Sequence, residues 1–219
     1  MSARAFFMAT RTPIQRRAAG ALLVASLSAA VVISARRLER PYRAEGPSFR
    51  TKGPADAKIL IGEFSDFQCP ACAAAHQPLK GIESLFEGRV RVVFKHFPLE
   101  RRHPLAREAA RAAECAGQQG KFWELHDRLF EKQPEWGEGA SSDPDWTVKL
   151  AGGLGLDMPA FNACRKNPET DRGIDADIKE GNDQWVGSTP TFFINGKRFS
   201  GAGQLTKGGM RWIERQLKP

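Results

Sequence analysis

Two cysteines, Cys69 and Cys72, lie where the sequence predicts that a strand ends and a helix begins. Residues 58–64 form a short apolar run that is typical of a strand buried on both faces of a sheet. The residues after Cys72 are rich in alanine, and Pro70 suits the first turn of a helix. A second strand is expected over residues 89–94, where valine recurs. The start of the domain therefore predicts a βαβ unit with both cysteines at its strand-to-helix turn.

The middle of the chain, from about 104 to 185, shows almost no strand pattern. It contains helical candidates at 105–116, 121–130, 144–150, 158–164 and 174–185. We interpret this stretch as a helical insertion.

Strand patterns return near the end of the chain. Residues 191–194 and 197–199 flank Asn195-Gly196, a dipeptide that favours a type I′ hairpin. A helix is expected over 204–217. The sequence thus predicts an α/β domain over 54–219, in which a βαβ unit and a ββα unit are separated by the helical insertion.

The first 53 residues differ in character from the rest. Residues 18–35 contain no charged side chain, and Arg16 and Arg17 precede them. A positively charged segment followed by such a run is typical of an export signal or a single membrane anchor. We expect a basic N-terminal segment over 1–17, a signal or transmembrane helix over 18–35, and a linker over 36–53. The alternative for 18–35 is a helix buried in a folded domain.

The formal net charge of the chain is +8 at pH 7. This excess lies within the first 53 residues, because residues 54–219 contain equal numbers of basic and acidic side chains. A nucleic-acid-binding domain would carry clustered positive charge on its folded surface. We therefore expect no nucleic-acid partner.

A single Cys-x-x-Cys motif can be a redox pair, half of a zinc site, or two buried thiols. His76 is a candidate third ligand for a metal site on Cys69 and Cys72. The position at a helix N-terminus favours a thiolate at Cys69, since unpaired N–H groups and the positive helix end stabilise negative charge there. Cys72, one turn further into the helix, is then placed to resolve a mixed disulfide. The redox interpretation is favoured, and the other two stay open.

Two segments together resemble the DsbA-like branch of the thioredoxin superfamily. They are residues 63–72, which end in the Cys-x-x-Cys motif, and Ser188-Thr189-Pro190-Thr191 ahead of the hairpin. The resemblance runs from about Gly53 to the C-terminus. It implies a thioredoxin fold with a helical insertion, and an extracytoplasmic thiol–disulfide oxidoreductase that needs no bound cofactor or metal.

The resemblance also implies roles for five residues. Cys69 corresponds to the attacking cysteine and Cys72 to the resolving one. Pro190 corresponds to a cis-proline that faces the cysteine pair, and Thr189 before it would offer its backbone to an extended substrate. Glu63 corresponds to a buried acid that can relay the proton of Cys72.

The other two cysteines, Cys115 and Cys164, both fall in the predicted insertion. Two buried free thiols are one possibility. Some DsbA-like proteins carry a second bond in this region, and exported proteins tend to pair their cysteines, so we expect a structural Cys115–Cys164 disulfide. Such a bond would support an oxidising compartment.

The function expected from these features is disulfide formation in exported proteins. The substrates would be reduced or unfolded proteins, and a membrane enzyme of the DsbB or vitamin-K-epoxide-reductase type would reoxidise the pair. The domain would lie outside the cytoplasm, anchored to the membrane, or periplasmic or secreted if the leader is cleaved. Ala71 stands where strong oxidants of the family carry histidine, so a reductase or isomerase is an alternative. A metal-binding or chaperone-like module on Cys69, Cys72 and His76 is an alternative of another class.

Overall fold

The computed structural model describes residues 41–137 and 145–218. All of these residues except Pro41 fall in the second of two compact units, Tyr42–Pro219. The segments predicted over 1–17 and 18–35, and the first part of the predicted linker, lie outside the described residues. Among the described residues, no helix is both long enough and apolar enough to cross a membrane.

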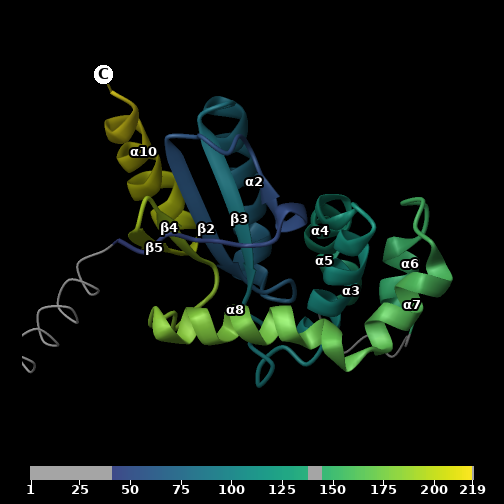
Figure 1. Cartoon of the computed structure of the whole chain (residues 1–219). Coiled ribbons are helices and arrows are strands. Elements are labelled where there is room, and N and C mark those ends of the chain that lie inside the picture. Colours follow the sequence, from purple (N-terminus) through teal and green to yellow (C-terminus); the bar gives the residue numbers. More distant parts are fainter. Residues whose placement is uncertain (1–40, 138–144, 219) are drawn as a thin grey trace, which may run out of the picture. The chain divides into compact units, whose positions relative to one another are not determined.

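A mixed five-stranded sheet forms the centre of this unit, with the strand order β1-β3-β2-β4-β5. Its strands are β1 (Thr51–Lys52), β2 (Ile59–Ser65), β3 (Val90–His96), β4 (Thr191–Ile194) and β5 (Lys197–Ser200). Strands β2 and β3 are parallel and are connected by helix α2 (Pro70–Leu85), which confirms the predicted βαβ unit. Strand β4 pairs antiparallel with β2, so the sheet has the thioredoxin arrangement (Figure 1).

Every described element between β3 and β4 is helical, as the sequence predicts for the insertion. These helices are α3 (Ala106–Gln118), α4 (Phe122–Glu131), α5 (Gln133–Trp136), α6 (Trp146–Ala151), α7 (Met158–Lys166), a 3₁₀ turn (Pro168–Thr170) and α8 (Asp171–Asp183). In Figure 1, α3 to α7 gather on the side of α2 that faces away from the C-terminal helix.

Two apolar clusters meet at α2. Cys72, in the first turn of α2, packs with Phe94 and with Phe122 and Leu125 from α4. Leu79, further along the same helix, packs with the sheet and the C-terminal helix instead. Helix α2 therefore contributes side chains to both the core of the insertion and the core of the sheet.

The predicted hairpin connects β4 and β5. Asn195 has φ +47° and Gly196 has φ +82°, the two positive values that a type I′ turn requires. The helix after β5 starts earlier than predicted, as α9 (Gly201–Gln204), and continues through a π-helical turn (Leu205–Gly209) into α10 (Met210–Leu217). A side chain at Gly209 would lie 2.9 Å from Ile194, so glycine permits this close approach to the sheet.

Residues 42–53 pack on the domain, and we call them the N-terminal strap. The Tyr42 ring lies 4.6 Å from the Phe193 ring, centroid to centroid. At its other end the strap adds β1 to the edge of the sheet, where Thr51 pairs with Val93. The prediction of a linker over 36–53 is therefore wrong for this part, and the domain begins before residue 54.

A buried ion cluster explains why the strap is ordered. Arg50 is only 2% exposed and binds the carboxylates of Glu114 on α3 and Asp177 on α8. Lys95 on β3 shares Asp177, at 3.0 Å. In the sequence this segment resembles a linker, because it is basic and contains proline and glycine. Its charged partners lie far along the chain, so no local pattern predicts them.

Candidate redox site

Cys69 is the residue immediately before α2, at its N-cap position. Its side chain is only slightly exposed, and its Sγ lies 3.6 Å from the carbonyl oxygen of Thr189, to which the protonated form of Cys69 donates a hydrogen bond. A hydrogen bond from the Cys72 thiol lowers the pKa of Cys69 to about 5, against the opposing effect of burial. Backbone N–H groups of Cys72 and Ala71 act in the same direction. Cys69 is thus a thiolate at neutral pH, which is the nucleophilic form.

Cys72 has the opposite character. It is fully buried, and burial, together with the neighbouring Cys69, raises its pKa well above the ordinary value. The backbone N–H of Asp66 donates to its Sγ at 3.4 Å. Both cysteines are free thiols in this structure. The pair therefore combines an ionised, slightly exposed sulfur at Cys69 with a protonated, fully buried sulfur at Cys72.

The peptide bond between Thr189 and Pro190 is cis. Both residues are buried, and the loop they form is held by two hydrogen bonds. The Thr191 hydroxyl donates to the Ser188 carbonyl at 2.7 Å, and the Gly201 N–H donates to the Pro190 carbonyl at 2.8 Å. The structure therefore brings Thr189 and Pro190 to Cys69, as the family resemblance implies.

Glu63 is buried on β2, and burial raises the pKa of its carboxyl to about 7. It does not bond to either cysteine directly. The Ser65 side chain, two residues along the same face of the strand, lies near both groups and lowers the pKa of the Glu63 carboxyl and of the Cys72 thiol. Its buried hydroxyl makes no hydrogen bond within the described residues, so Ser65 is a neighbour common to Glu63 and Cys72, and the sequence suggested no role for it.

Asp66 is a second residue that sequence reasoning missed, although it lies within the recognised motif. Its buried carboxylate accepts hydrogen bonds from the backbone N–H of Gln68 (2.8 Å), the backbone N–H of Leu99 (2.8 Å) and the imidazole of His103 (2.7 Å). These bonds fix residues 66–69, which we call the redox turn, to the loop between β3 and α3. A charged residue at a predicted buried strand end was the signal that could have identified it.

Gln133 at the start of α5 holds the same turn from the other side. Its side-chain amide donates to the carbonyl oxygens of Phe67 and Cys69, at 2.7 and 3.0 Å. The turn before α2 is therefore fastened by side chains from the insertion as well as by its own backbone.

Cys115 on α3 and Cys164 on α7 form a disulfide across a sequence separation of 49 residues. Cys115 is buried in the core of the insertion. The bond joins two helices of the insertion and leaves Cys69 and Cys72 as the free pair.

His76 does not join the two cysteines in a metal site. Its imidazole bonds to the Asp127 carboxylate at 3.0 Å, and His126 bonds to the same oxygen at 2.9 Å. Burial lowers the pKa of His126 to about 4, so its ring is neutral at pH 7. Among the described residues, the group with metal-binding potential is His76, His126 and Asp127, without a cysteine. The alternative metal site on Cys69, Cys72 and His76 is not assembled there.

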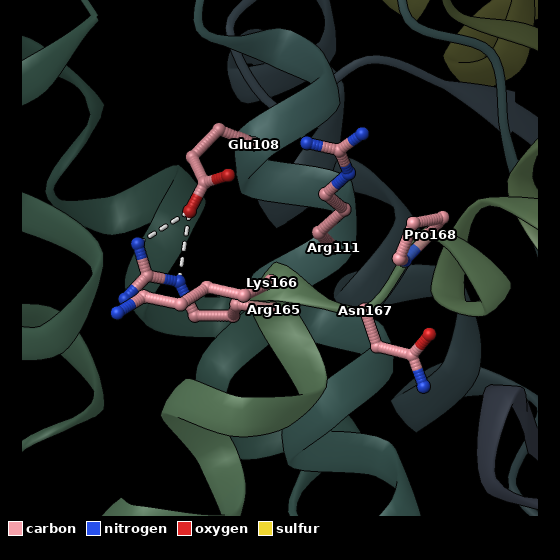
Figure 2. A pocket seen from close by; sticks show the side chains of 6 residues that line it. All are labelled: Glu108, Arg111, Arg165, Lys166, Asn167 and Pro168. Carbon is pink, nitrogen blue, oxygen red and sulfur yellow. Dashed lines mark hydrogen bonds and ion pairs between the residues drawn. The ribbon is translucent and has the colours of Figure 1, made fainter.

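A cavity of about 330 Å³ lies at the end of α7, next in sequence to Cys164 (Figure 2). Its lining includes Arg165, which binds Glu108 at 2.8 Å, and Arg111, which pairs with Asp171. Since carboxylates already neutralise both guanidinium groups, we assign no ligand to this cavity.

Residues 47–211 match a family model described as Thioredoxin. Among solved structures, the chain is similar to DsbA2 of Pseudomonas aeruginosa, with 26% sequence identity and a TM-score of 0.63, over 81% of this chain and 100% of that one. It is also similar to oxidised BdbD of Bacillus subtilis, with a TM-score of 0.69 over 82% of this chain and 100% of that one. The identity to BdbD is 23%, so this likeness concerns the fold alone.

The curated relatives that match this chain are named as antiporters and not as oxidoreductases. The Na(+)/H(+) antiporter NhaA 1 of Salinispora arenicola is 36% identical over 151 residues, which are 69% of this chain and 22% of that protein. NhaA 1 of Mycobacterium sp. (strain KMS) is 35% identical over 173 residues, which are 75% of this chain and 26% of that protein. The chain spans about a quarter of the length of these relatives, and antiporter activity is named for those whole proteins.

Proposed function

Because this chain belongs to the thioredoxin family and is a thiol–disulfide oxidoreductase of the DsbA type, we propose that it forms disulfide bonds in reduced proteins outside the cytoplasm. The observation that carries this proposal is the arrangement of three groups. Cys69 lies at the helix N-terminus, its sulfur lies against the Thr189 carbonyl, and Cys72 lies buried behind it.

The reaction starts from the oxidised pair. A substrate thiolate attacks the Sγ of Cys69, the Cys69–Cys72 bond breaks, and Cys72 leaves with the electron pair. A second substrate thiolate then attacks the substrate sulfur of this mixed disulfide and releases Cys69 as a thiolate. The substrate gains one disulfide, and the protein takes up two electrons as two reduced sulfurs.

Cys72 needs a proton when it leaves, since burial disfavours its thiolate. Glu63, with a pKa of about 7, holds a proton in part of the molecules at neutral pH, and the Ser65 side chain lies near both Glu63 and Cys72. We assign Glu63 the role of proton donor in this step and proton acceptor in reoxidation.

Location and partners follow from the same proposal. The Cys115–Cys164 bond supports an oxidising compartment, because structural disulfides persist there and are rare in the cytosol. Residues 18–35 would act as a membrane anchor or a cleaved signal, and exported proteins would be the substrates. A quinone-linked membrane enzyme of the DsbB or vitamin-K-epoxide-reductase type would return the pair to the disulfide form.

Disulfide transfer tests this proposal directly. The oxidised full chain is mixed with a reduced, unfolded protein whose activity depends on its disulfides, and recovery of that activity is followed. We expect recovery with the wild type and none above background with Cys69→Ser. Equal recovery with both proteins would overturn the proposal, as would failure of the oxidised wild type to transfer its bond.

A further inference from the structure

Trp185 combines two features that are unfavourable for a folded domain. Its side chain is 84% exposed, and only one other large apolar residue in the described part of the chain, Leu85, is exposed to a similar degree. Its backbone has φ +56°, a left-handed conformation that bulky residues rarely adopt. The end of α8 accounts for the left-handed backbone, but the fold does not account for an exposed tryptophan at this position.

The position of Trp185 is that of a helix cap. The N–H of Trp185 bonds to the Asn182 carbonyl, and the N–H of Val186 bonds to the Gly181 carbonyl, which closes the end of α8. Glycine is the usual residue at such a left-handed cap, since it lacks the side chain that makes this conformation costly. Tryptophan at this place stabilises the domain less than glycine would, so we look for its role in binding.

The redox site is close in the chain. Residues 186–189 lead from Trp185 to the cis bond before Pro190, and Figure 1 shows this connection between α8 and β4. Since the Thr189 carbonyl contacts the Cys69 thiol, a polypeptide bound along this loop is held beside the reacting sulfur.

A cavity of about 620 Å³ adjoins the same loop. Phe97, Ile178 and Val186 give it apolar walls, and Arg101 and Arg102 are exposed at its edge. Within the described residues neither arginine forms an ion pair, whereas the neighbouring Glu100 is bound to Arg107. The cavity therefore offers an apolar surface with uncompensated positive charge.

The wall formed by residues 97–102 is also attached to the redox turn. The N–H of Leu99 donates to the Asp66 carboxylate, and the N–H of Asp66 donates to Cys72. Two hydrogen bonds thus link the cavity wall to the buried sulfur through Asp66.

We propose that Trp185 and this cavity bind an extended segment of the protein that exchanges disulfides at Cys69. Apolar side chains of that segment contact Trp185 and the walls of the neighbouring cavity, and an acidic side chain lies near Arg101 and Arg102. The inference rests on the proposed function and adds a substrate preference to it, for apolar sequences with acidic residues near the cysteine. A polypeptide fits better than a small molecule, because the Thr189 backbone can pair with an extended chain.

The first experiment measures binding without chemistry. Two labelled peptides are compared, and each contains an apolar residue and a serine in place of the reacting cysteine. One carries two aspartates and the other two lysines. The protein is the full chain with Cys69→Ser. Trp185→Gly should bind the acidic peptide roughly tenfold more weakly, the effect of losing one aromatic anchor. Its thermal stability should be equal or higher, because the backbone strain is relieved. Leu85→Ala is the matched control and should bind like the parent.

The second experiment tests the charge preference. The double variant Arg101→Glu/Arg102→Glu should bind the acidic peptide more weakly and the lysine peptide more tightly than the parent does. Both changes in affinity should be smaller at high salt. Lys58→Glu, before β2 and so at the opposite end of that strand from the redox turn, is the control. Equal affinities of the parent for both peptides would overturn the charge preference.

Exchange kinetics separate this inference from the proposed function. With cysteine-containing peptides and wild-type Cys69, Trp185→Gly should slow exchange with the acidic peptide and leave exchange with glutathione unchanged. Equal peptide binding by the parent and Trp185→Gly would overturn the inference alone. Peptide binding that depends on Trp185, without any disulfide exchange by the wild type, would overturn the proposed function alone.

Discussion

The Sγ of Cys69 lies 3.6 Å from the carbonyl oxygen of Thr189, the residue whose bond to Pro190 is cis. The two residues are 120 positions apart in the chain, and their loops lie together because the C-terminal end of β2 pairs with the N-terminal end of β4. A substrate strand that pairs with the Thr189 backbone therefore places its own sulfur next to Cys69. Under the proposed function, substrate binding and disulfide exchange would therefore take place at the same short segment.

The ionisation of Cys69 gives the first prediction. In the reduced protein the rate of alkylation of Cys69 should follow an ionisation with a pKa of about 5, far below that of a free thiol. Cys72→Ala should move this midpoint upward, because the largest stabilising interaction of the thiolate comes from the Cys72 thiol. The measurement is the rate of iodoacetamide modification against pH. A midpoint that is the same with and without Cys72 would contradict this assignment.

The reduction potential of the pair should lie on the oxidising side of thioredoxin. A Cys69 pKa of about 5, compared with ~7 in thioredoxin, stabilises the reduced form and should raise the potential by roughly 50 mV above ~−270 mV at pH 7. Titration against glutathione, with alkylation and peptide mapping of each cysteine, measures it. A value at or below that of thioredoxin would favour a reductase and count against the proposed direction.

Glu63 should destabilise the folded protein in a pH-dependent way. Its folded-state pKa of about 7 exceeds the ordinary value of 4.5, so the folded state loses stability relative to the unfolded state as pH rises from 4.5 to 7. Glu63→Gln removes this loss. It should be more stable than the wild type by about 3 kcal/mol at pH 8 and nearly equal at pH 4, as measured by urea unfolding of the reduced forms. A difference that is independent of pH would refute the buried, protonated carboxyl.

The Cys115–Cys164 bond should stabilise the domain without taking part in exchange. It closes a loop of 49 residues, so replacing both cysteines by alanine should cost about 4 kcal/mol of unfolding free energy by loop entropy. Peptide mapping during a glutathione titration should show this bond intact at potentials that reduce Cys69 and Cys72. Reduction of both bonds at the same potential would show that the second pair also exchanges.

The N-terminal strap should be required for stability. Arg50→Met leaves the buried carboxylates of Glu114 and Asp177 without their guanidinium partner, and we expect a loss of about 3–5 kcal/mol. Arg43→Met, an exposed position in the same strap, is the control. Equal chemical stability of the two variants would mean that the ion cluster contributes little.

Features with a local pattern were predictable from the sequence. The apolar run at β2, the alanine-rich start of α2 and the Asn195-Gly196 turn each depend on residues that are neighbours in the chain. The roles of Cys69, Cys72, Thr189, Pro190 and Glu63 came from a motif resemblance. The structure adds their mutual placement, and the roles themselves stay proposals.

Features that depend on distant partners were not predictable. In the sequence Arg50 resembles a linker residue, because its partner Asp177 lies 127 positions later in the chain. Gln133 reaches the carbonyl of Phe67 across 66 positions, and the sequence holds no local sign of that bond. The left-handed backbone of Trp185 was not predictable for a different reason. Glycine or asparagine usually indicates such a helix cap, and neither stands at this position.

Helix α2 contributes to both apolar clusters, with Cys72 in the one and Leu79 in the other. His76, between them, binds Asp127 of α4 and so couples the helix to the insertion. If the insertion tilts against the sheet, the packing around Cys72 changes. By thermodynamic reciprocity, oxidation or reduction of the sulfur pair would then shift that tilt by the same free energy. A partner that binds one orientation of the insertion more tightly would therefore shift the reduction potential of the pair.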